Sequence, residues 1–305
     1  MNVLTTGDFT HHAPAFDSPG FQLRLTRFNH KRLRPEPDSS AWESGLAEEI
    51  RMRHLEGLYM EHLRAGIAPW MQAVPTTPAA FMDWFDDLRH DGPGQGDPLF
   101  PWLAEHASMS DMKWFLTQEA AGEAGFDDLV ALTQVQFPAR PKVEMASNYW
   151  DEMGRGRLQA MHGLMLSQCV EALQLQPSME STVWESLALG NLMVALAANR
   201  HYAYQSVGAL GVIEMTAPGR VSRVNEGLKR LGVDAPGRRY FQIHAGLDIK
   251  HSEQWNREVI EPLVSSNPEL ARPIAEGALL RLAAGASCFA RYRAQLWGGE
   301  QKAVA

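Results

Sequence analysis

The chain has 305 residues, of which 45% are hydrophobic and 21% are charged, and only two are cysteines, Cys169 and Cys288. This composition excludes wholesale disorder, and the length suits one large domain or two small ones. Two cysteines are too few for a disulfide framework or a cysteine-rich zinc site, and their scarcity indicates a reducing, cytoplasmic setting. The net charge of −8 argues against nucleic acid as a main partner, because phosphate binding needs surplus lysine and arginine.

The sequence predicts neither a membrane span nor a secretory leader. No run approaches the roughly 18 consecutive apolar residues that mark a membrane helix. Even the richest stretch, residues 187–198, contains Gly190 and Asn191. The first residues have neither a basic start nor an apolar core, so no signal peptide is predicted. These observations leave an acidic cytoplasmic protein and do not decide whether it is an enzyme.

Residues 1–39 are predicted to form an irregular N-terminal arm, because four prolines fall within them and no helical or strand period persists. From Ser40 onward the pattern is helical and strand signals are scarce, so residues 40–305 are predicted to form a single all-α domain. The expected helices span roughly residues 40–64, 78–88, 108–134, 144–152, 157–174, 181–199, 202–215, 218–231, 237–252 and 268–297.

The sharpest candidate for chemistry is a stripe on the helix expected over residues 237–252. His244, Asp248 and His251 are spaced by four and three residues, which places their side chains within roughly 60° of one another around the helix. Ile243 and Trp255 lie on or near the same side, so the stripe is expected to enter the core. Buried ionisable groups are costly unless they are paired or bind a metal. A solvent-facing stripe is the alternative, and this motif alone leaves the two evenly balanced.

Glu152 and His162 form a second candidate pair. They are ten residues apart, which is about 15 Å along a straight α-helix, too far to share a metal centre. Gly154 and Gly156 lie between them and permit a break in the helix. A shared site therefore requires an interruption near these glycines, and a straight helix through both residues would exclude it. The alternative is a helix–turn–helix joint capped by Glu152.

Three further acidic residues are candidates. Glu119 and Glu123 are four residues apart on a helix, where like charges are mildly destabilising, so a bound cation would account for the pair. A solvated helix face is the alternative for either of them. Glu214 is the only acid of the apolar segment 203–214, at a helix end where the dipole disfavours a carboxylate. Carboxylates and imidazoles without cysteine suit iron or manganese, and carboxylates can bridge two ions.

Over roughly residues 110–255, these motifs resemble those of the heme-oxygenase-like diiron oxidases and oxygenases. The last ligand helix of that family carries Asp or His, then Asp four positions later and His three positions further on. His244, Asp248 and His251 match this spacing in its His-first variant.

The other candidates match the family less uniformly. Glu152 and His162 match a Glu followed after ten residues by His in some N-oxygenating members, and the run from Glu152 to Gly156 is similar to the family's Glu-Tyr-Gly-Asp-Gly. Glu214 lies thirty residues before the final triad, as an additional Glu does in several members. The first core helix of the family also supplies a Glu, for which Glu119 is our choice and Glu123 the alternative.

The resemblance implies a heme-oxygenase-like bundle of about seven core helices, an O2-dependent oxidoreductase with two Fe2+ ions and O2 as cosubstrate. The implied metal ligands are Glu119, Glu152, His162, Glu214, His244, Asp248 and His251.

The ten-residue spacing and Glu214 favour N-oxygenation of an amine of a small, amino-acid-derived metabolite in specialised metabolism. Oxidative C–C cleavage or desaturation of a fatty or amino acid is the alternative reaction. Alternatives from other classes are a non-catalytic helical binding or scaffold protein and a non-redox metalloenzyme such as a hydrolase.

The expected partners are a small-molecule substrate and an external electron donor, without nucleic acid or membrane, and a homodimer is left open. Several arginines are candidates to hold a substrate carboxylate, although a surface position is the commoner explanation for arginine. These candidates are Arg155, Arg157, Arg200, Arg238 and Arg239.

Overall fold

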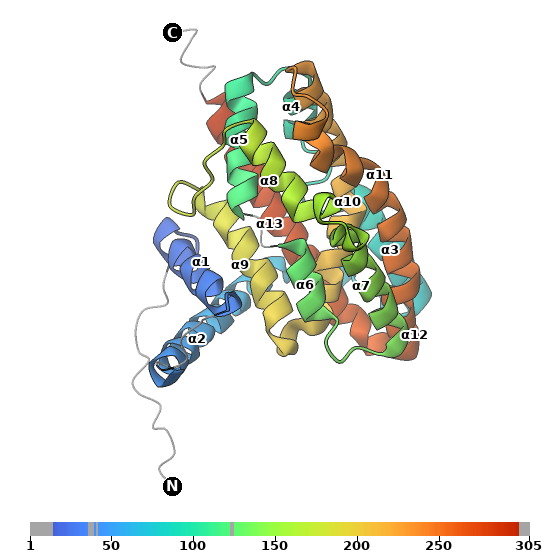
Figure 1. Cartoon of the computed structure of the whole chain (residues 1–305). Coiled ribbons are helices and arrows are strands. Elements are labelled where there is room, and N and C mark those ends of the chain that lie inside the picture. Colours follow the sequence, from blue (N-terminus) through green and yellow to red (C-terminus); the bar gives the residue numbers. More distant parts are fainter. Residues whose placement is uncertain (1–14, 36–39, 41, 123–124, 299–305) are drawn as a thin grey trace.

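Every regular element in the described part of the chain is a helix, which confirms the predicted all-α class (Figure 1). The computed structural model describes residues 15–35, 40, 42–122 and 125–298. Its α-helices are α1 (Pro19–Leu33), α2 (Trp42–Ile67), α3 (Pro78–Asp91), α4 (Leu99–Glu105), α5 (Met109–Gly122), α6 (Phe126–Thr133), α7 (Ala139–Glu152), α8 (His162–Ala172), α9 (Trp184–Ala198), α10 (Ala203–Arg230), α11 (Arg239–Trp255), α12 (Glu261–Ser266) and α13 (Ala271–Trp297).

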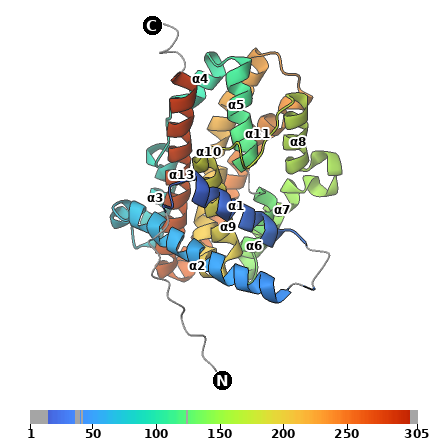
Figure 2. The ribbon, with the colours of Figure 1, turned by 90° about the vertical axis from the view of Figure 1, so that its left-hand side faces the viewer.

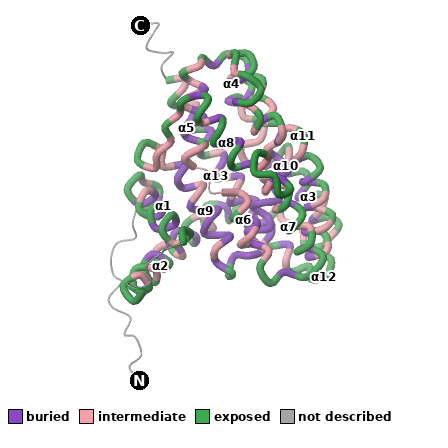
Figure 3. Tube along the Cα trace, in the orientation of Figure 1, coloured by how far each residue is buried: buried purple, intermediate pink, exposed green. Residues whose placement is uncertain are grey.

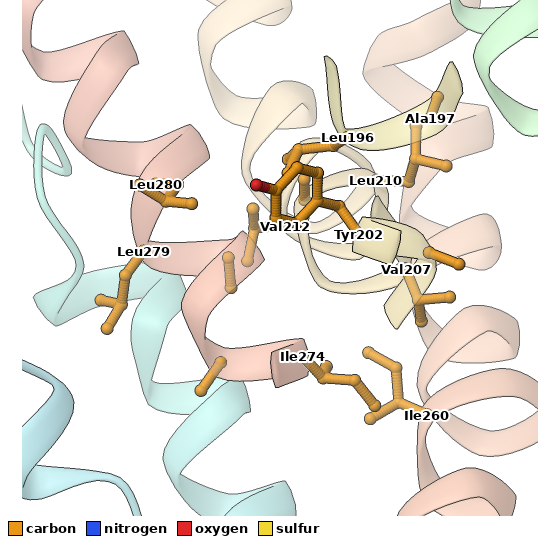
Figure 4. Close-up of a cluster of buried hydrophobic side chains, with 14 of the residues drawn as sticks. Leu196, Ala197, Tyr202, Val207, Leu210, Val212, Ile260, Ile274, Leu279 and Leu280 are labelled. Carbon is orange, nitrogen blue, oxygen red and sulfur yellow. The ribbon is translucent and has the colours of Figure 1, made fainter. Parts of the chain in front are cut away.

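The helix α10 lies in the interior and packs along α11 and α13. Glycine allows the close approach to α13, because a Cβ atom on Gly208 would collide with the Ile274 carbonyl oxygen and one on Gly277 with the Gln205 carbonyl oxygen. Burial is greatest along α9, α10 and α13, whereas α2 is mostly exposed (Figure 3). Figure 4 shows part of the apolar core around this contact, including Leu196, Val207, Leu210, Ile260 and Ile274.

One continuous helix, α10, replaces the two that the sequence predicted over residues 202–215 and 218–231. Pro218 lies inside it. Proline removes one intrahelical hydrogen bond, and for that reason a break was expected. The packing of α10 against α4, α11 and α13 keeps the helix intact despite that loss. As a result, Glu214 and Arg220, which lie on either side of the proline, are held in a fixed relation on one helix.

The prediction of an irregular N-terminal arm is wrong for residues 19–33, which form α1. The Ser18 hydroxyl caps this helix by accepting a hydrogen bond from the Phe21 N–H, and Leu25 is fully buried. Figure 2 shows α1 crossing α9, with which it is in contact, while α2 runs below it. The apolar face of α1 is too short and too interrupted by basic residues to give a clear period in the sequence.

Two other boundaries differ from the prediction. The expected helix over residues 108–134 is divided into α5 and α6, and Gly125 takes a positive φ of 74° just before α6 begins. The short helices α4 and α12 were not predicted, because each is too short to show a helical period. No helix in the described residues is both long and apolar enough to cross a membrane.

Candidate metal centre

The chain is interrupted between Glu152 and His162, as a shared site requires. Glu152 ends α7, the chain turns back through two short 3-10 turns, and His162 begins α8. Gly154 has a φ of 62°, and a Cβ atom there would collide with the backbone of Ala160. The turn brings His162 Nδ1 to 2.8 Å from Glu152 Oε2. A straight helix through both residues is therefore excluded.

Six of the seven predicted ligands come together in two groups of buried side chains. The first group consists of Glu152, His162 and His244. The second group consists of Glu214, Asp248 and His251. Within each group, one donor atom from each residue lies within 4.8 Å of the others, and all six side chains are buried. The helix α11 contributes to both groups and contacts α7, α8 and α10, so the two groups are neighbours (Figure 1).

The ring of His244 is oriented by the backbone of its own helix. Its Nδ1 lies 2.7 Å from the Tyr240 carbonyl oxygen. Because a carbonyl can only accept, Nδ1 carries the proton and donates it, and Nε2 keeps its lone pair. The His162 and His244 rings are in edge contact, with centroids 4.5 Å apart. The first group thus presents a neutral imidazole with a fixed tautomer.

Two residues of α7 that the sequence did not single out support the second group. Asp151 Oδ2 lies 3.1 Å from His251 Nε2, which leaves His251 Nδ1 directed at the group, 3.6 Å from Glu214 Oε2. Asn148 Nδ2 donates a 2.7 Å hydrogen bond to Glu214 Oε1. Such outer partners commonly fix the orientation of metal ligands. Their positions could have pointed to them, because Asp151 directly precedes Glu152 and Asn148 lies one helical turn before it.

The donor atoms of the two groups are of the kind that binds iron. Three buried donor atoms have no hydrogen-bond partner among the described residues: His162 Nδ1, His251 Nδ1 and Asp248 Oδ1. His162 Nδ1 is close to Glu152 Oε2 but is not aligned for a hydrogen bond with it. Unpartnered buried polar atoms are costly, and atoms that converge on one point are satisfied by a cation. Oxygen and imidazole donors without thiolate suit ferrous iron.

The profile of a protein family described as iron-containing redox enzyme matches residues 113–286 of the chain. This match spans more than half of the sequence and includes both groups of candidate ligands. The chain belongs to the iron-containing redox enzyme family. The match and the helical structure confirm the predicted heme-oxygenase-like fold, and the protein is an iron-dependent redox enzyme. No curated protein sequence matches the chain.

Burial gives the ionisable groups of this iron-containing redox enzyme unusual pKa values. Burial and the neighbouring Glu214 and Glu152 carboxylates raise the pKa of Asp248 well above its usual range. Burial and the adjacent His162 lower the pKa of His244 to about 4. Burial alone would lower the pKa of His251, but the Glu214 and Asp151 carboxylates outweigh it and raise the pKa to about 9. The three buried carboxylates therefore create a strong demand for positive charge.

Glu119 is not brought to either group, and the structure does not support its assignment as a metal ligand. Its carboxylate accepts a 2.7 Å hydrogen bond from the Tyr292 hydroxyl and faces a separate cavity. Arg281 and Arg220 lie near enough to act on its charge. The alternative residue, Glu123, lies outside the described residues. Sequence spacing could place Glu119 on a helix but could not tell what that helix faces.

None of the five arginines considered from the sequence lines a cavity next to the metal groups of this iron-containing redox enzyme, as far as the structure describes the chain. Arg155 pairs with Asp151, Arg200 donates to backbone carbonyls, and Arg238 donates to Asn225 and to a backbone carbonyl. The remaining two, Arg157 and Arg239, are exposed. Arg155 and Arg200 are exposed as well, so the surface explanation, given as the commoner one, fits four of the five.

Proposed function

We propose that this iron-containing redox enzyme is a non-heme diiron oxygenase that uses O2 as its cosubstrate. The observation that carries the proposal is the pairing of two neighbouring carboxylate and imidazole groups, each compact enough for one ion, with α11 contributing to both. Iron bound there would supply the electrons that activate O2. The proposed ligands are the six residues of the two groups, without Glu119.

The protein's own residues would keep the ligands in position. The Tyr240 carbonyl holds the Nδ1 proton of His244 and directs Nε2 into the first group. Asp151 holds the Nε2 proton of His251 and directs Nδ1 into the second group. Asn148 fixes one oxygen of Glu214 and leaves the other facing His251. Ligands that are held in advance lose little freedom when the metal binds.

A cavity of about 140 Å³ gives a substrate access to these groups. Glu152, Glu214, His244 and Asp248 line it on one side. The rest of the lining is mostly apolar and includes Phe126, Leu129, Met193, Ile213 and Val221. An apolar lining excludes water around the reacting atoms and favours a small organic substrate.

The reaction that we propose is N-oxygenation of an amine of a small, amino-acid-derived metabolite. The support for it is the ten-residue spacing of Glu152 and His162 together with Glu214 in the second group. Oxidative C–C cleavage or desaturation of a fatty or amino acid is the second candidate, which the apolar cavity lining favours. Product analysis separates the two, because only the first forms a new N–O bond.

The test of the diiron oxygenase is anaerobic loading with Fe2+, metal analysis, and exposure of the loaded protein to O2. The proposal expects about two irons per chain and uptake of O2 that depends on iron. A scaffold protein would retain no iron, and a hydrolase would bind metal without consuming O2. Either of these outcomes, or a single iron per chain, would overturn the proposal.

A further inference from the structure

The outer side of α7 and the turn that follows it carry a stripe of exposed apolar side chains. Val143 and Trp150 are seven residues apart on α7, so they share one face of the helix, and their exposed fractions are 70% and 53%. The turn folds back against this face, because a Cβ atom on Gly156 would lie 2.9 Å from the Trp150 ring. Leu158, in the same turn, is 65% exposed. Large apolar side chains grouped in this way typically mark an interaction surface (Figure 3).

Basic side chains flank this stripe at both ends. Arg140 and Lys142 lie in the first turn of α7, whereas Arg155 and Arg157 lie in the turn that follows the helix, and all four are exposed. Among the described residues, Lys142 and Arg157 have no ion-pair partner. An apolar centre with a charged rim is the usual anatomy of a transient protein interface. We call the three apolar residues and these four bases the hairpin surface.

The hairpin surface is positive within an acidic chain. The acids of the same segment that lie outside the metal-ligand groups are Glu144 and Asp151, so four bases stand against two acids. The neighbouring Arg257 and Glu258 add one charge of each sign. The whole chain, in contrast, carries a net charge of −8. An acidic protein is therefore attracted to this surface and repelled by much of the rest of the molecule.

The second metal-ligand group lies two hydrogen bonds beneath the hairpin surface. Arg155 Nε donates a 2.6 Å hydrogen bond to Asp151 Oδ1, and His251 Nε2 lies 3.1 Å from Asp151 Oδ2. One carboxylate thus links an exposed guanidinium to a ligand imidazole. Electrons pass quickly between proteins only over short distances, so this part of the surface is suited to their entry.

We propose that the hairpin surface docks an acidic one-electron carrier protein, which reduces iron held by the metal-ligand groups. Each docked carrier loses one electron, and one Fe3+ ion becomes Fe2+. The helix α7 has 14 residues and is about 21 Å long, which suits the small interfaces of transient electron-transfer complexes. That the electrons reach two irons rests on the proposed function, whereas docking itself requires no iron.

The test uses metal-free full-length protein and isothermal titration with three carrier proteins. Two are acidic, a plant-type [2Fe–2S] ferredoxin and a flavodoxin, and one is basic, a cytochrome c. The better acidic carrier is expected to bind at least about tenfold more tightly than cytochrome c and to lose affinity as added salt screens the charges. Which acidic carrier binds more tightly tells whether the natural donor is an iron–sulfur protein or a flavoprotein. If neither binds, or cytochrome c binds as tightly, the proposal is wrong.

The residue assignment is tested by Lys142→Glu and Arg157→Glu, with Arg51→Glu as the matched control. The first two reverse a charge at opposite ends of the hairpin surface, and Arg51 is an exposed residue of α2. Each of the first two variants is expected to bind the acidic carrier at least about fivefold more weakly, and the control to bind it as the wild type does. Circular dichroism checks that helicity is kept. Unchanged affinity in both variants would overturn the assignment.

A second copy of the chain is the rival occupant of the hairpin surface. Light scattering of the protein alone tests for it. If the protein dimerises and Lys142→Glu or Arg157→Glu makes it monomeric, the surface belongs to a homodimer and the docking proposal is wrong. A monomer, or a dimer that neither variant affects, leaves the surface free for the carrier, as the proposal expects.

These results separate this inference from the proposed function. Binding of an acidic carrier to metal-free protein, combined with failure to take up two irons, would leave the docking surface standing and overturn the diiron oxygenase. Uptake of two irons and of O2 without binding of either acidic carrier would do the reverse.

Discussion

The two candidate metal-ligand groups adjoin a second cavity, called the arginine cavity, which Arg220 and Arg281 line. On α10, Glu214 belongs to the second metal-ligand group, and Arg220, six residues later, lines the arginine cavity. Six residues correspond to roughly 9 Å along a helix. Glu152, Glu214 and Asp248 line the first place, whereas Arg220 and Arg281 line the second together with Glu119. The comparison shows how one uninterrupted helix holds a buried acid and a buried base at a fixed separation.

The largest expected effect is loss of iron on removal of a ligand. Asp248→Ala and His251→Ala are each expected to weaken Fe2+ binding at least about 100-fold, since each removes a donor of the second group. Metal analysis after anaerobic loading measures the loss, and circular dichroism checks that helicity is kept. Glu253→Gln is the control, because Glu253 is an exposed residue of the same helix. Full iron occupancy in His251→Ala would contradict the assignment.

A strong pH dependence of iron binding is the next expected effect. The pKa values of Asp248 and His251 are both raised, the latter to about 9, so both hold protons at neutral pH without metal. Metal ligands must be deprotonated, so the apparent Fe2+ affinity should rise with pH and level off above about 9. The expected slope is about tenfold per pH unit for each proton released. Equal affinities at pH 6 and pH 8 would show that neither proton is displaced.

A smaller loss of iron affinity is expected when an outer partner of the ligands is removed. Asn148→Ala deletes the donor that orients Glu214, and such losses are typically about 10- to 100-fold. The neighbouring exposed residue gives the control variant Ser147→Ala. Iron titration of both variants would show whether α7 positions the second group; equal affinities would mean that it does not.

The smallest expected effect on iron binding is that of a substitution at Glu119, which lies outside both groups. Glu119→Gln should leave iron stoichiometry at the wild-type value, because Glu119 lies outside both groups. Iron titration of this variant and of the wild type measures the stoichiometry. Loss of an iron ion in this variant would show that Glu119 is a metal ligand after all.

Sequence reasoning succeeded where the relevant information is local. The four- and three-residue spacings of His244, Asp248 and His251 place them on one face of any helix. Gly154 and Gly156 likewise predicted the chain reversal that brings Glu152 close to His162. In each case the backbone within a few residues determines the outcome.

The sequence failed where the outcome depends on packing between distant segments. Pro218 does not break α10 because α4, α11 and α13 pack against this helix. These contacts cannot be read from the residues around the proline. Glu119 belongs to the arginine cavity because of what α10 and α13 present opposite it. A signal for that cavity was available, since Arg281 is the only charged residue between Glu276 and Arg291.

The chain reversal between α7 and α8 has a consequence for the stability of the protein. Iron held between Glu152 and His162 would close a loop of eleven residues, and iron in both groups would cross-link α7, α8, α10 and α11. A ligand that binds only the folded chain stabilises it by about 2.7 kcal/mol at a concentration 100-fold above its Kd. The ions would thus act as removable cross-links, and the melting temperature of the bundle would report how much iron it carries.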